Sequence, residues 1–326
     1  MEQLQLPGLE GDLLRVEAAL RAAVQSDDPY LSEIAVHLVR AGGKRIRPTL
    51  VLAAALAAGG QVDEAVISGS VSVELVHLGS LYHDDVMDEA ETRRGTESVN
   101  HRWGNLTAIL TGDFLLARAS EIAASLGTEV AALLARTIGN LCQGEVAQLE
   151  HAFNPERPEP AYLRAIAGKT AALLATSARI GGIVSGASPE FVDALTGFGQ
   201  AFGMTFQIWD DIRDLVATDD QLGKPAGHDM VEGTYTLPVL RALADPSTGP
   251  ELRSLLGGPL DDVNRDRARS LVLSSGGVEE AVTEARRWAE TASEHLEVLR
   301  RGGAPTGPVD ALAGVGRALV DGLARQ

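Results

Sequence analysis

Apolar residues recur at spacings of three and four along nearly the whole chain, and this periodicity constrains the fold most. Such spacing places apolar side chains on one face of an α-helix, whereas no convincing stretch alternates apolar and polar residues as a half-buried strand would. The pattern therefore predicts an all-α protein in which a sheet is unexpected. The expected helices span residues 10–26, 29–41, 48–58, 63–89, 105–126, 128–152, 161–186, 189–217, 235–244, 261–275, 278–301 and 308–324.

Prolines and glycines support these boundaries. Pro189 follows Ser188, a pairing typical of a helix start. Glycine pairs at 42–43, 59–60 and 302–303 fall just past expected helix ends. Several expected helices have 20 residues or more, which corresponds to about 30 Å each. Loops at 90–104, 153–160 and 217–234 do not resemble interdomain linkers, so we expect one large helical bundle and a single domain over residues 1–326.

The charge balance limits the possible ligands. Apolar residues make up 45% of the chain, enough for a sizeable core, and the net charge is −17. A chain this acidic repels nucleic acids and anionic membranes unless a local basic patch prevails, so we expect no nucleic-acid partner. An anionic substrate would have to be held by specific lysines, arginines or metal ions.

Cysteine usage and hydropathy bear on the compartment. Cys142 is the only cysteine, so an intrachain disulfide is impossible, as suits a reducing cytoplasm. The first 20 residues lack the basic and apolar regions of a signal peptide. The longest uninterrupted apolar runs, such as residues 49–58, are far shorter than a membrane span. We therefore expect a cytoplasmic protein without an integral membrane segment.

Two aspartate clusters give the strongest functional signal. Both have the form Asp-Asp-x-x-Asp, and they comprise Asp84, Asp85, Asp88, Asp210, Asp211 and Asp214. With 21 aspartates in 326 residues, one such pattern is expected by chance about 0.09 times per chain. On a helix, positions i and i+4 share a face, which stacks Asp84 over Asp88 and Asp210 over Asp214.

Both clusters fall in the last turns of expected helices, where unpaired carbonyl groups already carry partial negative charge. Aspartates there repel the helix terminus and each other, unless a divalent cation joins them. Hard carboxylate oxygens suit Mg²⁺, which commonly binds one or two carboxylates together with substrate phosphates. A solvated acidic face is the simpler alternative for one cluster, but two clusters that each end an apolar helix favour metal binding.

Basic residues accompany the two clusters. They occur in Gly42-Gly43-Lys44-Arg45-Ile46-Arg47-Pro48, in Arg93-Arg94-Gly95, in Lys169-Thr170 and in Gly223-Lys224-Pro225. Any one of them could serve charge balance or capping. As a set in an acidic chain, they indicate a site for a polyanion and metal ions, because guanidinium forks and ammonium groups match phosphate oxygens.

These residues resemble the polyprenyl synthetase family, the head-to-tail trans-isoprenyl diphosphate synthases. The resemblance runs from about Gly42 to Leu240. It rests on Gly-Gly-Lys-Arg-Ile-Arg-Pro, Leu-Tyr-His-Asp-Asp-Val-Met-Asp, the downstream Arg-Arg-Gly, Lys-Thr, Phe-Gln-Ile-Trp-Asp-Asp and Gly-Lys-Pro-Ala-Gly-His-Asp, in the family order. It implies an isoprenoid-synthase-type helical bundle around a central cavity, which condenses isopentenyl diphosphate with an allylic diphosphate.

The resemblance also implies roles for residues. Three Mg²⁺ ions would be held mainly by Asp84, Asp88 and Asp210, with Asp85, Asp211 and Asp214 binding directly or through water. The allylic diphosphate would contact Arg93, Lys169 and Lys224, and the isopentenyl diphosphate Lys44, Arg47, His77 and Arg94. Thr170 and Gln207 would stabilise the allylic cation.

The sequence departs from the family pattern at two positions. Thr234 stands where the family often has lysine in Gly-Lys-x-Thr-Leu-Pro, so one diphosphate contact is missing. Arg213 stands inside the second cluster, where an aliphatic residue is usual. The departure at Arg213 leaves the metal geometry open.

Product length in this family depends on residues about one turn below the first cluster. Here they are Gly79 and Ser80, both small. The resemblance thus predicts an open tunnel and a product longer than twenty carbons, in the range of about thirty to fifty, as in quinone side chains. Small residues can instead serve close helix packing.

Three further points stay open. A terpene cyclase shares the first aspartate cluster but usually carries a different second metal motif. A non-catalytic subunit of a heteromeric synthase usually lacks one cluster, and both are present here. Family members are commonly homodimers, and we expect the same of this chain.

Overall fold

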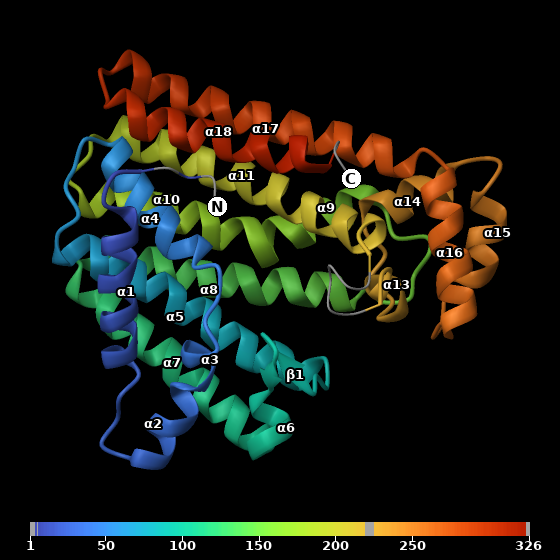
Figure 1. Ribbon diagram of the computed structural model, residues 1–326, viewed down its shortest axis with the longest axis horizontal. Helices are drawn as coiled ribbons and strands as arrows, with labels where there is room; N and C mark the ends of the chain where they lie inside the picture. Colours follow the sequence, from blue (N-terminus) through green and yellow to red (C-terminus); the bar gives the residue numbers. More distant parts are fainter. Residues whose placement is uncertain (1–3, 5, 219–224, 324–326) are drawn as a thin grey trace. The chain divides into compact units, whose positions relative to one another are not determined.

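The computed structural model describes residue 4, residues 6–218 and residues 225–323, and these are mostly helical (Figure 1). The all-α prediction is confirmed. The elements are α1 (Leu9–Ala23), α2 (Pro29–Ala35), α3 (His37–Arg40), α4 (Ile46–Ala57), α5 (Glu64–Met87), β1 (Thr92–Arg93), β2 (Thr96–Glu97), α6 (Val99–Trp103), α7 (Asn105–Ser125), α8 (Thr128–Leu149), α9 (Glu159–Ile166), the π-helical turn η1 (Ala167–Ala171), α10 (Ala172–Val184), α11 (Pro189–Val216), α13 (His228–Val231), α14 (Leu237–Ala244), α15 (Gly249–Leu255), α16 (Asp262–Ser274), α17 (Gly277–Arg301) and α18 (Thr306–Leu323).

The long helices lie where the apolar periodicity predicts them, and the differences are local. The helix expected over 161–186 is divided into α9, η1 and α10. Short helices α6, α13 and α15 were not expected. The expectation of no sheet is wrong by one hairpin, β1–β2. Its turn residues, Arg94 and Gly95, both have positive φ, 54° and 74°, as a two-residue type I′ turn requires.

The chain divides into two compact units, and each combines segments that are distant in the sequence. Unit 1 comprises residues 1–138, 176–196 and 297–312, and unit 2 comprises residues 139–175, 197–296 and 313–326. Helices α8, α10, α11, α17 and α18 contribute residues to both. The single-domain organisation stays a prediction.

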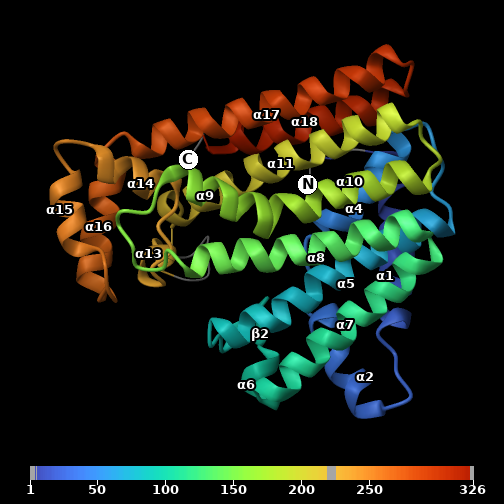
Figure 2. The same ribbon diagram turned by 180° about the vertical axis from the view of Figure 1, so that it is seen from behind.

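Helix α5 forms the centre of unit 1. It runs beside α7 in both ribbon views and also packs against α1 and α4 (Figures 1 and 2). Asp63 caps its N-terminus by accepting hydrogen bonds from two backbone N–H groups. Gly79 permits the close approach of α7, because a Cβ there would lie 3.1 Å from the carbonyl oxygen of Gly112.

Among the described residues, α5 is also the one helix whose length and hydropathy would suit a membrane span. Its most apolar window is 72% buried inside the fold. Core helices of soluble proteins pass the same test, so this finding is weak evidence of a membrane segment.

Unit 2 has its own apolar core. Helices α14, α15 and α16 pack on one another (Figure 1). Tyr162, Ile208, Tyr235 and Leu237 are almost fully buried within it. This core supports η1 and the last turns of α11, which carry the residues of the site described next.

Candidate functional site

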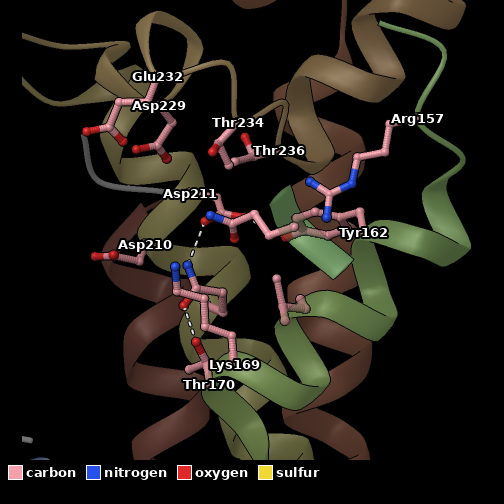
Figure 3. A pocket seen from close by; sticks show the side chains of 13 residues that line it. Arg157, Tyr162, Lys169, Thr170, Asp210, Asp211, Asp229, Glu232, Thr234 and Thr236 are labelled. Carbon is pink, nitrogen blue, oxygen red and sulfur yellow. Dashed lines mark hydrogen bonds between the residues drawn. The ribbon is translucent and has the colours of Figure 1, made fainter. Parts of the chain in front are cut away.

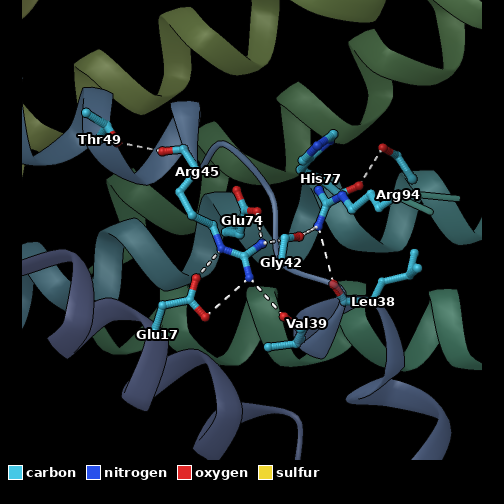
Figure 4. Close-up of polar contacts among 10 residues, drawn as sticks. Glu17, Leu38, Val39, Gly42, Arg45, Thr49, Glu74, His77 and Arg94 are labelled. Atoms are coloured by element: carbon cyan, nitrogen blue, oxygen red, sulfur yellow. Dashed lines mark hydrogen bonds and ion pairs between the residues drawn. The ribbon is translucent and has the colours of Figure 1, made fainter. Parts of the chain in front are cut away.

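In unit 1, the Gly42–Pro48 segment is anchored by a buried arginine. Arg45, at φ 46°, precedes α4 and is 7% exposed. Its guanidinium donates to Glu74 on α5 at 2.8 Å and also pairs with Glu17 on α1 (Figure 4). It also donates to the carbonyl oxygen of Val39 in α3 at 3.1 Å. Arg45 therefore joins three elements to the turn that carries the predicted cations Lys44 and Arg47.

Arg94 reaches the same turn from the hairpin. Its guanidinium donates to the carbonyl oxygens of Gly42 and Leu38 (Figure 4). Gly43, at φ 149°, leaves the space for it, because a Cβ there would lie 2.9 Å from the guanidinium carbon. The structure thus brings together Arg94 and the Gly42–Pro48 turn, as the sequence predicts for one diphosphate site.

The electrostatics of this cluster are strongly basic. Burial lowers the pKa of Arg47 to about 10, with Glu74 raising it and Arg94 lowering it. Arg47 Nε has no hydrogen-bond partner among the described residues. Burial, and then the charges of Arg47 and Arg94, hold the pKa of His77 well below 6.5. His77 is therefore neutral at pH 7, and with Arg47 and Arg94 nearby its surroundings favour an anion.

The first aspartate cluster ends α5, as predicted. Asp84 is half-buried in the last turn, and Asp88 is the exposed C-cap residue. Asp85 points elsewhere: it is fully buried and accepts a hydrogen bond of 2.6 Å from Arg93 Nε. Burial raises the pKa of Asp85, while Arg93 lowers it. Arg93 is thus paired with Asp85, and its contact with the allylic diphosphate stays a prediction.

In unit 2, two glycines bring α8 against η1. A Cβ on Gly144 would lie 2.3 Å from the backbone nitrogen of Lys169, and one on Gly168 would lie 2.9 Å from the Cα of Gly144. The π-helical turn displays the side chains of Lys169 and Thr170 at this point. Lys169 Nζ pairs with Glu145 of α8 at 2.7 Å.

Thr170 begins a chain of hydrogen bonds. Its hydroxyl donates to Gln207 Oε1 at 2.6 Å, and Gln207 Nε2 donates to Asp211 Oδ1 at 2.8 Å (Figure 3). The other carboxylate oxygen of Asp211 accepts from the hydroxyl of Tyr162 at 2.5 Å. Burial raises the pKa of Asp211 to about 7 despite these bonds. Asp211 therefore fixes Gln207, which fixes Thr170.

These groups line one pocket of unit 2, with a volume of about 160 Å³ (Figure 3). The lining is mostly polar, and it joins residues of α8, α9, η1, α11 and the segment around α13. Its members are Gln148, Arg157, Tyr162, Ile166, Lys169, Thr170, Gln207, Asp210, Asp211, Asp229, Glu232, Thr234 and Thr236.

The other predicted residues of the second cluster lie around this pocket. Asp210 is exposed and lines it, whereas Asp214 is 6% exposed and accepts a hydrogen bond from the backbone N–H of Asp229. Arg213 places its guanidinium 5.5 Å from the ring centroid of Trp209, one turn earlier. Lys224 lies outside the described residues.

Sequence reasoning missed Arg157, Tyr162, Asp229 and Glu232 as pocket residues. Arg157 lies in the loop expected at 153–160, and only its place between two prolines at 155 and 158 distinguishes it there. Tyr162 is separated from Asp211 by 49 positions. Pairing at that distance depends on tertiary structure.

A metal site is not preformed within the described residues, among which no three histidine, cysteine or acidic side chains converge around one point. The donor chemistry of each unit nevertheless fits hard divalent cations, because Asp84 and Asp88 in unit 1 and Asp210 in unit 2 present carboxylates on partly or fully exposed positions. Asp85 and Asp211 are instead buried and hydrogen-bonded to Arg93, Tyr162 and Gln207.

The two chain-length candidates differ in environment. Gly79 is buried against Gly112 and Leu116 of α7. Ser80 is half-buried, and its hydroxyl donates to the carbonyl oxygen of His77 at 2.9 Å. His77, Ser80 and Asp84 share one face of α5 and are each partly exposed, whereas residues 69–76 of the same helix are buried. The role of both small residues in product length stays a prediction.

The profile of the polyprenyl synthetase family matches residues 28–271. The chain belongs to this family. It is 42% identical over 294 residues to heptaprenyl diphosphate synthase component 2 of Geobacillus stearothermophilus, with 89% of this chain and 91% of that protein covered. It is 40% identical to nonaprenyl diphosphate synthase of Mycobacterium tuberculosis, covering 87% of this chain and 86% of that protein.

Solved structures of the family share the fold. Geranylgeranyl pyrophosphate synthase from Corynebacterium glutamicum, complexed with calcium and isoprenyl diphosphate, superposes with a TM-score of 0.83 at 39% identity. The similarity covers 96% of this chain and 95% of that one. The family membership and the isoprenoid-synthase-type fold predicted from the motifs are thereby confirmed.

Proposed function

We propose that this chain is a trans-prenyltransferase that condenses isopentenyl diphosphate with an allylic diphosphate, head to tail, to make a polyprenyl diphosphate. The observation that carries the proposal is the oriented chain Thr170–Gln207–Asp211–Tyr162 beside Lys169, in a member of this family. Such a chain holds its dipoles fixed before any reaction begins, which is how enzymes stabilise developing charge.

The donor directions suit a cationic reaction centre. The Thr170 hydroxyl donates its one proton to Gln207 Oε1, so the lone pairs of the hydroxyl oxygen can interact with a positive charge nearby. Lys169, held by Glu145 at 2.7 Å, supplies an ammonium group for the allylic diphosphate. In unit 1, Arg47 and Arg94, together with Lys44, supply the positive charge to bind the diphosphate of isopentenyl diphosphate. The neutral imidazole of His77 would donate a hydrogen bond to it.

We propose Mg²⁺ as the metal, with three ions bound in the presence of substrate. The relative that was solved with calcium and isoprenyl diphosphate supports a divalent cation. Asp84, Asp88 and Asp210 would be the direct ligands, and the hydrogen bonds of Asp85 and Asp211 favour an orienting role for those two. When bound, the ions neutralise the charge that collects on the departing diphosphate.

We further propose a product longer than twenty carbons. The half-exposed Ser80, about one turn below Asp84, leaves that level of α5 without a large side chain. The nonaprenyl synthase among the relatives supports a long product, whereas the geranylgeranyl synthase is a shorter-chain relative.

A cytoplasmic homodimer is the proposed assembly. Helix α7 exposes an apolar stripe, with Leu106 72% and Leu110 57% exposed, which suits a protein partner. The heptaprenyl relative carries the name component 2, so a different partner chain is the rival. The mass of the purified chain in solution, measured by light scattering, separates a homodimer from a monomer that awaits its partner.

The deciding experiment is a product assay. Purified chain, Mg²⁺, excess isopentenyl diphosphate and farnesyl diphosphate are incubated, and the dephosphorylated products are sized by mass spectrometry. We expect a ladder that extends beyond twenty carbons and disappears with EDTA. A product of twenty carbons would refute the chain-length proposal alone, and a cyclic hydrocarbon or no turnover would refute the synthase proposal for the isolated chain.

A further inference from the structure

Arg157 is a buried cation that the motifs do not single out. It lies in the loop between α8 and α9, is 5% exposed and lines the pocket of unit 2 (Figure 3). Its guanidinium carbon lies 5.5 Å from the ring centroid of Tyr162. Nη1 donates to the carbonyl oxygen of Tyr235 at 3.4 Å, a long hydrogen bond. Nε and Nη2 have no hydrogen-bond partner among the described residues.

The nearby carboxylate of Asp211 does not meet this need. Its two oxygens accept hydrogen bonds from Tyr162 and Gln207, whereas Nε and Nη2 of Arg157 donate to neither of them. Burial lowers the pKa of Arg157, and Tyr162 and Asp211 counteract this only in part. A buried guanidinium with unused donors is unfavourable in a folded protein unless an acceptor arrives from outside.

The charges that line the pocket indicate which kind of ligand would accept hydrogen bonds from Arg157. Four lining residues are acidic: Asp210, Asp211, Asp229 and Glu232. The lining holds two cations, Lys169 and Arg157, and Glu145 already pairs with Lys169. A phosphate group binding here requires further positive charge and donors, both of which the unused fork of Arg157 provides.

Thr234 lines the same pocket. In the family pattern that this sequence resembles, lysine is frequent at this position, whereas this chain has threonine. We propose that Arg157 contacts a phosphate oxygen of the allylic diphosphate and supplies the positive charge that Thr234 does not. The assignment rests on the proposed function, because that function supplies the diphosphate.

The test compares Arg157→Gln with Arg253→Gln in the full-length chain. Arg253 is 43% exposed and pairs with Glu156, the neighbour of Arg157, so its variant removes the same charge outside the pocket. Binding of inorganic pyrophosphate with Mg²⁺ is measured by calorimetry, and KM for farnesyl and isopentenyl diphosphates by a transfer assay. Circular dichroism checks that each variant is folded.

Loss of a charge-assisted contact corresponds to about a 10- to 100-fold weaker affinity. We expect Arg157→Gln to weaken pyrophosphate binding and raise KM for farnesyl diphosphate by such factors, with KM for isopentenyl diphosphate within two-fold. Arg253→Gln stays within two-fold throughout. Unchanged pyrophosphate binding in folded Arg157→Gln overturns the proposal, as does an equal rise of both KM values. If Arg157→Gln does not fold, Arg157→Lys, which keeps the charge but not the fork, must raise KM for farnesyl diphosphate by a smaller factor and leave KM for isopentenyl diphosphate within two-fold. A folded Arg157→Lys protein with unchanged KM for farnesyl diphosphate overturns the proposal.

A double variant tests whether a cation at position 234 can replace the one at position 157. Adding Thr234→Lys to Arg157→Gln should restore pyrophosphate affinity to within three-fold of wild type, and no recovery would overturn the link between the two positions. The binding arm also separates this inference from the proposed function. A chain that transfers no prenyl group, yet binds pyrophosphate through Arg157, would refute the synthase proposal and support the phosphate contact.

Discussion

Replacing Glu74 by glutamine should destabilise the protein by far more than replacing a surface glutamate on the same helix. Glu74 is 1% exposed and pairs with Arg45, whose side chain is 6% exposed. Removing one partner of a buried ion pair costs about 3–5 kcal/mol, because the other charge stays buried without full compensation. Glu17 remains bound to Arg45, so the lower end, about 3 kcal/mol, is expected.

The matched control is Glu64→Gln at the start of α5. Glu64 is 89% exposed and pairs with Arg15, which is 41% exposed. Such a pair contributes about 0–1 kcal/mol. Because both variants remove one carboxylate from α5, their difference isolates burial as the cause.

The assay is thermal unfolding followed by circular dichroism, with a urea titration in parallel. For 326 residues, an unfolding entropy of about 2.1 cal/mol/K per residue converts 3 kcal/mol into a Tm lower by about 4 °C. Glu64→Gln should shift Tm by about 1.5 °C or less. A Glu74→Gln protein within about 1 kcal/mol of wild type would refute the reasoning, since the Arg45 cluster would then contribute no more than a surface pair.

Three further predictions concern the site itself. The folded state holds the pKa of His77 well below 6.5, so as the pH falls the unfolded chain binds the His77 proton first, and the free energy of unfolding should fall by up to about 1.4 kcal/mol per pH unit below about pH 6.5. Urea titrations at pH 7 and pH 5 should show a smaller loss of stability for His77→Asn than for wild type, and an equal loss would contradict the assignment. Gly144→Ala should reduce kcat at least about 100-fold, because the new Cβ would lie 2.3 Å from the backbone nitrogen of Lys169 and displace the reacting groups. Gly139→Ala on the same helix, whose Cβ would meet nothing within 4 Å, should keep the wild-type kcat, and equal kcat values for the two variants would argue against a packing effect. Ser80→Phe should shorten the product to twenty carbons or fewer in the product assay, and an unchanged ladder would remove Ser80 from the chain-length determinants.

Much of the fold could be predicted because it depends on local patterns. Repeated apolar spacing located the long helices, and α5 and α11 end at the aspartate clusters as expected. Short elements such as α6, α13 and α15 span one or two turns, too few for a periodic pattern to distinguish from a loop. The hairpin β1–β2 was missed for the same reason, although Arg94-Gly95 provides its turn.

For the site, too, the sequence identified individual residues but not the contacts between them. Lys169, Thr170 and Gln207 were identified from motifs, and the structure joins the last two by a hydrogen bond. The burial of Asp85 and Asp211 could not be predicted from the spacing of the aspartates, because it depends on their contacts with Arg93 and Tyr162.

The amino-acid sequence by itself determined the helical class and the family, because helix periodicity and motif spacing are local properties of the chain. Tertiary structure alone decided that Gly144 and Gly168 meet, which accompanies a π-helical turn where a continuous helix was expected. It also decided that Arg157 lies buried beside Tyr162. Burial and contact between residues distant in sequence set the energy of each charge, and neither can be calculated from local sequence.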